Sequence, residues 1–163
     1  EAHPELAAAV ATSGNELANH SWSHPSGSFW WLLPRRIASE IDRAQAAITT
    51  VSASAPRRFR APVGMKNPWV HPILRRRGLR LVGWTARGFD GVGFNPRRAA
   101  DAILQDVTPG AIILLHEGRT EQDGRRISQE CLTLVLDGLA GLGYRCVIPS
   151  DGQLLAGRRK TNR

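Results

Sequence analysis

The sequence contains no long apolar run and very little cysteine. No stretch of it approaches the roughly 20 consecutive apolar residues that a membrane-spanning helix needs, so no transmembrane segment is expected. The two cysteines, Cys131 and Cys146, have no zinc-site spacing and fall on a predicted helix and a predicted strand. We therefore expect buried free thiols, rather than a disulfide or a cysteine-ligated metal.

Acidic residues are fewer than basic ones. Lysine and arginine number 22 against 14 aspartates and glutamates, which gives a formal net charge of +8. A nucleic-acid interface is one interpretation of this excess. The arginines, however, occur as scattered pairs and triplets, and no aromatic residues alternate with them to stack on bases. We favour a solvated, arginine-rich surface and expect no nucleic-acid partner; affinity with a steep salt dependence would argue for one.

The chain alternates helical and strand-like patterns joined by short turns. One helix begins near Pro34, and its buried face is predicted by apolar residues spaced four and three apart, namely Ile37, Ile41, Ala44, Ile48 and Val51. Further helices are predicted over 3–14, 67–78, 95–107 and 127–142, the last apolar on nearly every side and so expected to be buried. Short strands are predicted over 15–21, 58–62, 79–84, 111–116 and 144–148.

This alternation predicts an α/β fold with parallel strands inside and helices outside, either doubly wound or a barrel. In both architectures the chemistry gathers at the carboxyl ends of the strands. Polar side chains follow the predicted strands at these ends: His20 and His24, Arg60, Asp90, and His116. We expect them to converge at one mouth of the sheet.

The histidine pair lies in the segment NHSWSHPSG, residues 19–27. Neutral imidazoles are good zinc ligands, and Pro25 disfavours helical geometry at His24, so a loop that folds both rings together is predicted. Two hydrogen-bonded or exposed histidines with no metal are the alternative, which the spacing alone leaves open. Arg60 could orient a carboxylate, or be a surface arginine. His116, after an apolar strand, is either a catalytic acid–base or a satisfied core group.

These motifs together resemble the polysaccharide deacetylases of carbohydrate esterase family four, the NodB-homology domain. HSWSH is similar to the family motif H-[ST]-x-x-H, RAPVG to R-x-P-x-G, and IILLH to the family's fifth motif, while WTARGFDG occupies the place of the fourth. The resemblance implies a (β/α) barrel-like domain, distorted or incomplete, over residues 1–157. A basic tail, residues 158–163, is expected to be disordered.

The family's chemistry assigns roles to the residues that match its motifs. The resemblance implies a divalent metal, most usually zinc, with His20 and His24 as ligands, which polarises an acetamide carbonyl and activates a water. It implies that His116 is the general acid and that Arg60 helps to orient the catalytic carboxylate. Asp90 keeps the second acidic position of the fourth motif and is our candidate for orienting His116 or Arg60.

The same resemblance suggests how the substrate is held. Leu114 would line the pocket for the acetyl methyl group, and Trp84 and Pro62 are the other candidate substrate contacts. The implied substrate is an N-acetylated amino sugar in a polysaccharide or glycoconjugate, from which acetate is released. The sequence leaves open which sugar this is, and whether the protein works in the cytoplasm or at a bacterial cell envelope.

The chain departs from the family in one important respect. The family's first motif, T-F-D-D-G, supplies the base and the third metal ligand, and no Asp-Asp pair occurs in this sequence. In addition, Arg87 stands where many members have an aspartate. We therefore expect impaired deacetylation, and an incomplete barrel whose exposed strand edges favour homo-oligomers. A non-catalytic relative that binds a carbohydrate or a partner protein is the alternative.

Overall fold

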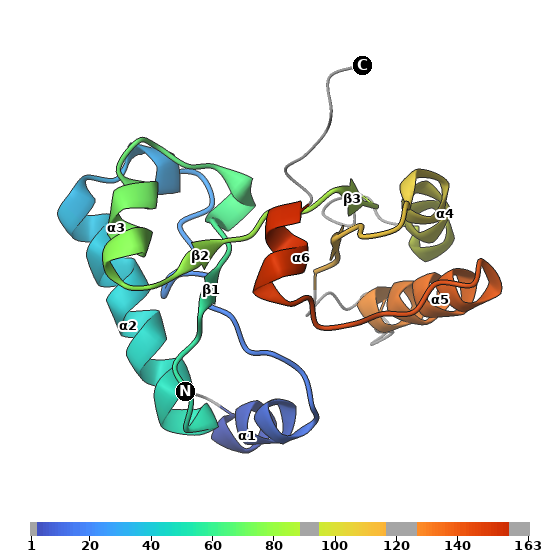
Figure 1. Cartoon of the computed structure of the whole chain (residues 1–163), viewed down its shortest axis with the longest axis horizontal. Coiled ribbons are helices and arrows are strands. Elements are labelled where there is room, and N and C mark those ends of the chain that lie inside the picture. The colour runs from blue at the N-terminus through green and yellow to red at the C-terminus, as the bar shows by residue number, and fades with distance from the viewer. Residues whose placement is uncertain (1–2, 89–94, 117–126, 157–163) are drawn as a thin grey trace. The chain divides into compact units, whose positions relative to one another are not determined.

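The computed structural model describes residues 3–88, 95–116 and 127–156 (Figure 1). The chain divides into two compact units, residues 1–83 and 84–163, and each is considered by itself. In both units, short parallel strands are connected by helices, as the alternating sequence pattern predicts. In the described ranges, no helix is both long and apolar enough to cross a membrane.

The first unit packs its helices around a pair of short strands (Figure 1). Its elements are α1 (Pro4–Thr12), the 3₁₀ helix η1 (Phe29–Trp31), α2 (Pro34–Ser52), β1 (Arg58–Phe59), η2 (Pro62–Gly64), α3 (Val70–Arg76) and β2 (Arg80–Leu81). Strand β1 pairs in parallel with β2, in the register Phe59↔Leu81, and Asn19 adds a parallel bridge to Phe59. Helix α3 connects β1 to β2, because parallel neighbours require a crossover connection.

The apolar stripe predicted for α2 lies in the core of this unit. Ile37 and Ile41 are fully buried and Ala44 nearly so, while the last two positions of the stripe are half-buried. Ile37 and Ile41 belong to one hydrophobic cluster, whose buried members are Phe29, Ile37, Ile41, Phe59, Ala61, Val70, Ile73, Leu74 and Leu79. The helix predicted to begin at Pro34 is confirmed.

The second unit repeats the strand–helix–strand pattern. It contains β3 (Ala86–Arg87), α4 (Pro96–Asp106), β4 (Ile113–Leu114), α5 (Ile127–Gly141) and α6 (Asp151–Ala156). Strands β3 and β4 are parallel, in the register Ala86↔Ile113 and Arg87↔Leu114. The predicted start of α4 is confirmed, since the Asn95 side chain accepts a hydrogen bond from the Arg98 amide at 3.1 Å. The core lies between α4 and α5, and its buried members are Ala99, Ala100, Ile103, Cys131, Val135 and Leu139.

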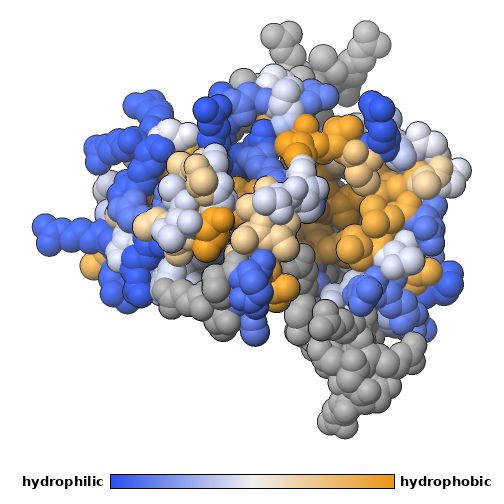
Figure 2. Space-filling view, turned by 90° about the horizontal axis from the view of Figure 1, so that it is seen from below, coloured by the Kyte–Doolittle hydropathy of each residue, from blue (hydrophilic) through white to orange (hydrophobic). Residues whose placement is uncertain are grey.

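The prediction that the 127–142 helix is buried all round is wrong. Val135 and Leu139 face α4, but Leu132 and Leu136 are each 45% exposed. Hydrophobic surface is visible in orange in the right-hand part of Figure 2, where α4 and α5 lie. Helix α5 packs through one face only, and the described residues provide no second layer over the other.

The strand predicted over 144–148 is also wrong, because no strand forms there and Val147 and Ile148 are more than half exposed. Helix α5 instead closes as the amides of Gly143 (φ +77°) and Tyr144 bond to the carbonyls of Ala140 and Leu139. Cys146 is exposed rather than buried, whereas Cys131 is buried as predicted. Helix α6 was not predicted.

The predicted incomplete barrel agrees with the observed strands. Within the described ranges the strands form two parallel two-stranded sheets, β1–β2 and β3–β4, and no closed barrel. The strand predicted over 15–21 is reduced to the single bridge at Asn19. The basic tail, 158–163, lies outside the described residues.

Candidate functional site

The two histidines of the first unit lie against each other. The ring centroids of His20 and His24 are 4.8 Å apart, with an edge-on angle of 67° between the ring planes. Both residues are exposed and lie in a loop rather than on a helix, as Pro25 led us to predict. The backbone at His24 has φ +48°, in the left-handed region that non-glycine residues rarely adopt. This unusual turn brings the second ring back toward the first.

The backbone carbonyl of Arg60, the first residue of the RAPVG motif, orients the His20 ring. His20 Nδ1 lies 2.8 Å from the carbonyl oxygen of Arg60. A carbonyl only accepts hydrogen bonds, so Nδ1 carries the proton and donates it. In the neutral ring the lone pair is then on Nε2, the atom that a metal would use. The structure thus brings Arg60 beside the histidine pair, as the sequence predicts.

Two buried polar residues, which the sequence analysis missed, hold this loop in place. Asn19 is completely buried; its Nδ2 donates to the Ile41 carbonyl and to Gln45 Oε1, each at 2.9 Å, and its Oδ1 accepts from the Ser21 amide at 3.0 Å. Glu40 of α2 is 8% exposed and accepts hydrogen bonds from the loop amides of Trp22 and Ser23. The sequence does contain an indication for Glu40. It stands directly before Ile41 on the apolar stripe of α2, and a carboxylate on a buried helix face needs hydrogen-bond partners.

Arg60 and Pro62 form the other half of the site in this unit. The Arg60 side chain is half-buried, and its Nη2 donates to the Gly83 carbonyl at 3.3 Å. Burial lowers the pKa of the Arg60 guanidinium below its ordinary value, although an arginine stays charged at neutral pH. Pro62 is buried and opens η2, where Val63 adopts φ +55°. The turn is closed by hydrogen bonds from the Gly64 amide to the Ala61 carbonyl at 2.9 Å and from the Met65 amide to the Pro62 carbonyl at 3.1 Å.

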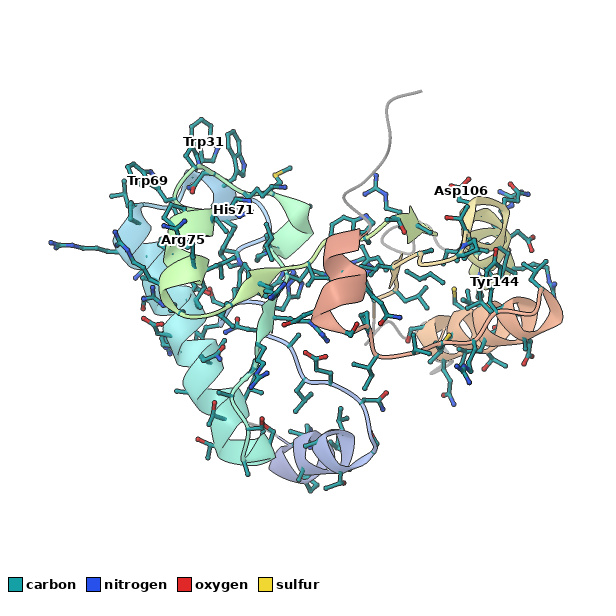
Figure 3. All side chains as sticks on the ribbon, viewed as in Figure 1. Trp31, Trp69, His71, Arg75, Asp106 and Tyr144 are labelled. Atoms are coloured by element: carbon teal, nitrogen blue, oxygen red, sulfur yellow. The ribbon has the colours of Figure 1, made fainter. Side chains whose placement is uncertain are left out.

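Exposed tryptophans continue from the histidine loop. The amide of Phe29 donates to the Pro25 carbonyl at 2.8 Å, so η1 follows the loop directly. The rings of Trp30 and Trp31 have centroids 3.9 Å apart, and Trp31 is 70% exposed. Figure 3 shows Trp31 and Trp69 at the same end of the first unit, pointing outward. Large exposed aromatic side chains of this kind mark binding surfaces on soluble domains.

The remaining predicted site residues belong to the second unit. Trp84 is half-buried and comes directly before Thr85, whose amide donates to the Ile112 carbonyl at 2.8 Å. Leu114 ends β4 and is buried, and His116 follows two residues later in an exposed position. Asp90 lies outside the described residues.

The histidine pair suits a divalent metal in part. Two imidazoles with close rings, one of them oriented by a carbonyl, match the usual arrangement of histidine ligands. A catalytic zinc normally has three protein ligands. In the part of the chain that is described, no group of three or more His, Cys, Asp or Glu side chains could hold a metal ion together. The histidine pair alone is therefore too small a ligand set for a catalytic zinc.

Comparison with known proteins places the chain in a family. The family model described as polysaccharide deacetylase matches residues 1–82, half of the chain. This chain is a member of the polysaccharide deacetylase family. A chitooligosaccharide deacetylase from Bradyrhizobium is 34% identical over 119 residues, which cover 71% of this chain and 52% of the relative. The chain thus spans about half the length of the chitooligosaccharide deacetylases that it matches.

Solved structures support the same NodB-homology assignment for this polysaccharide deacetylase domain. A family 4 carbohydrate esterase from Streptomyces lividans, in complex with acetate, has a TM-score of 0.78 and 27% identity, over 91% of this chain and 73% of its own. A family 4 acetyl xylan esterase from Clostridium thermocellum, in complex with a cobalt ion, has a TM-score of 0.78 and 25% identity, over 90% and 68%. The predicted family and its barrel-type fold are confirmed.

Proposed function

We propose that this polysaccharide deacetylase domain removes acetyl groups from an N-acetylated amino sugar in a polysaccharide or glycoconjugate. The observation that carries the proposal is the pairing of His20 and His24, with His20 Nδ1 held by the Arg60 carbonyl at 2.8 Å. It joins two motif regions of the chain in one place. Relatives named chitooligosaccharide deacetylase support an N-acetylglucosamine oligomer as the substrate to test first.

We propose zinc as the metal, with Nε2 of His20 and the His24 imidazole as two of its ligands. When bound, a divalent metal would supply a Lewis acid for the amide carbonyl and for the hydrolytic water. The cobalt ion in the acetyl xylan esterase structure supports a divalent metal in this family. The contribution of this chain is to hold both rings on one loop, with one ring already in the required tautomer.

The remaining steps need an acid, an orienting charge and a pocket. An amine leaves poorly unless it is protonated, so amide hydrolysis requires a general acid. We assign this role to His116, which is exposed just beyond β4 and accessible to a leaving group. The guanidinium of Arg60 is suited to holding a carboxylate, and Asp90 is the acidic residue that we assign to orientation. In the second unit, Leu114 would contact the acetyl methyl group and Trp84 the sugar. Pro62, a further candidate contact in the sequence, is buried in the first unit and would act by shaping the turn after Arg60.

The tryptophans beside the histidine loop support a saccharide substrate. The apolar face of a sugar ring packs against an indole, and Trp31 is 70% exposed. Its neighbour Trp30 stacks against it and limits its movement. A rigid aromatic surface of this kind loses little conformational entropy when a ligand binds.

We also propose that this chain alone deacetylates slowly. The histidine pair supplies two imidazoles, the described residues contain no group of three or more possible ligands, and the sequence holds no Asp-Asp pair. A site that lacks its third protein ligand binds the metal ion weakly. Without the Asp-Asp pair, no residue is assigned as the general base that deprotonates the water.

The test is acetate release from N-acetylglucosamine oligomers, measured with the chelated chain and after addition of Zn²⁺ or Co²⁺. We expect slow release that requires metal, is lost in His20→Ala and His24→Ala, and falls at least about 100-fold in His116→Ala, the size typical of a general acid. Release that persists in chelator, or in both histidine variants, would contradict the proposal.

Acetylated xylooligosaccharides are the matched substrate control. They present an ester rather than an amide, and the alcohol leaves more easily than an amine. We therefore expect His116→Ala to impair amide hydrolysis more than ester hydrolysis. Equal losses on the two substrates would contradict the role of His116 as the acid that protonates the amine.

A further inference from the structure

One buried carboxylate accepts three hydrogen bonds from the segment between the two histidines. Glu40 Oε2 accepts hydrogen bonds from the backbone amides of Trp22, at 3.1 Å, and Ser23, at 2.8 Å. Its Oε1 accepts from the Ser23 hydroxyl at 2.9 Å. All three donors lie between His20 and His24.

The loop needs such support because its backbone is unfavourable. Ser21 has φ +70° and His24 has φ +48°, both in the left-handed region that side-chain-bearing residues avoid. Inside the loop, the His24 amide donates to Ser21 Oγ at 3.1 Å. Hydrogen bonds to a buried carboxylate are stronger than neutral ones, so Glu40 can offset the strain that turns the second ring toward the first.

The position of Glu40 makes this support rigid. It lies on α2 beside Ile41, which is completely buried in the core of the first unit. The guanidinium of Arg43, one turn further along α2, lies 4.5 Å from the centroid of the Trp22 ring. The loop is therefore held against a helix that is itself fixed by packing.

We propose that Glu40 is a positioning residue that arranges the His20 and His24 rings as a pair before any metal binds. The use of that pair as metal ligands rests on the function proposed above, whereas the arrangement itself does not. Three donors satisfy the hydrogen-bonding needs of the buried carboxylate.

Two substitutions at Glu40 test whether its hydrogen bonds hold the loop. Glu40→Gln keeps the shape: the amide oxygen can accept from the two backbone amides, and its NH₂ can donate to the Ser23 hydroxyl. Glu40→Ala removes all three bonds. Ile73→Ala is the control for a general loss of stability, because Ile73 lies in the same core on α3 and takes no part in the hydrogen bonds between Glu40 and the loop.

The decisive measurement is made by NMR on the metal-free 163-residue chain. We expect a nuclear Overhauser effect between the His20 and His24 rings in the parent and in Glu40→Gln. In Glu40→Ala we expect it to disappear, with amide exchange at Trp22 and Ser23 at least tenfold faster, while Ile73→Ala keeps both. Ring contact and slow exchange that survive Glu40→Ala, or that are lost equally in Ile73→Ala, would overturn the proposal.

Ser23→Ala keeps the test decisive if Glu40→Ala does not fold. It removes one of the three bonds from the loop side, and we expect faster exchange of the Trp22 amide and a weaker ring contact. Unchanged exchange would count against Glu40 as the positioning residue.

A Co²⁺ titration of the same proteins, followed by visible absorption, tests the metal separately. We expect Glu40→Ala to bind at least tenfold more weakly and Glu40→Gln within about threefold of the parent, the range found for residues that orient metal ligands. If the parent binds no Co²⁺ yet Glu40→Ala loses the ring contact, the metal function fails while the positioning role holds.

Discussion

His20 Nδ1 donates a hydrogen bond to the Arg60 carbonyl oxygen over 2.8 Å. In this bond the His20 ring contacts the backbone of Arg60 and not its guanidinium. Substitution of the Arg60 side chain leaves this carbonyl in place. The tautomer of His20 and the charge of Arg60 are therefore separable by mutation. This separation gives the first prediction.

In Arg60→Ala, the neutral His20 ring should keep its proton on Nδ1, as in the parent. Long-range ¹H–¹⁵N correlation at about pH 8, where imidazoles are ordinarily neutral, identifies the tautomer. Catalysis should fall in the same variant, because the guanidinium is lost. A proton on Nε2 in the neutral ring of the parent would contradict the geometry, since Nδ1 would then have no proton to donate to the Arg60 carbonyl.

A second prediction concerns the ion pair between α2 and the end of α3. Arg77 Nε and Nη2 donate to the two carboxylate oxygens of Asp42 at 2.6 and 2.7 Å. The hydrogen bond from Arg77, aided by its charge, lowers the pKa of Asp42 below its usual 3.8, against a smaller opposing effect of burial. A carboxyl group with a lower pKa in the folded state stabilises the fold fully above its unfolded pKa, and this contribution is lost as the pH falls through the folded pKa.

Asp42→Asn should therefore cost up to about 1 kcal/mol at pH 7, the upper range for partly exposed pairs, and progressively less below about pH 4. Urea unfolding at a series of pH values measures the difference. In the Arg77→Gln background, Asp42→Asn should change stability little at any pH. A gap that persists there, or that widens in acid, would show that the pair is not its source.

The parts of the fold that the sequence predicted are those decided by local patterns. Pro34 and Asn95–Pro96 mark helix starts by backbone chemistry alone, and the Ile37–Ile41–Ala44 stripe identifies a buried helix face. The strand expected over 144–148 failed for the opposite reason. An apolar run becomes a strand only beside a partner strand, and its periodicity does not say whether one is available.

The site divides along the same line. The resemblance to the family motifs identified His20, His24 and Arg60, which the structure brings together. The residues that hold them there, Asn19 and Glu40, are distant in sequence from the groups that they support: Glu40 is on α2, 17 positions beyond Ser23. Such support depends on tertiary packing, which a single sequence does not display. In the sequence, the only indication of this support is that Glu40, a carboxylate, lies on the apolar stripe of α2.

A third prediction follows from the close approach of β3 to α4. Gly88 is buried, and a Cβ atom there would lie 2.6 Å from the Ala99 carbonyl oxygen and 2.8 Å from its Cβ. Backbone would have to move, so Gly88→Ala should destabilise the second unit by about 1–3 kcal/mol. Gly141→Ala, in open space at the end of α5, is the control and should be neutral or slightly stabilising. Thermal unfolding of both variants measures this, and equal melting temperatures would contradict the packing.

The last prediction concerns Trp31. If saccharides stack on the exposed indoles, Trp31→Ala should weaken binding of N-acetylglucosamine oligomers by about 1 kcal/mol, roughly fivefold, as measured by calorimetry. Stability should change by less than about 0.5 kcal/mol, because the side chain is 70% exposed. Leu33→Ala is the matched control: Leu33 is 72% exposed and close in sequence, but has no flat ring. An equal loss in both variants would indicate general apolar contact, and no loss in Trp31→Ala would place the saccharide elsewhere.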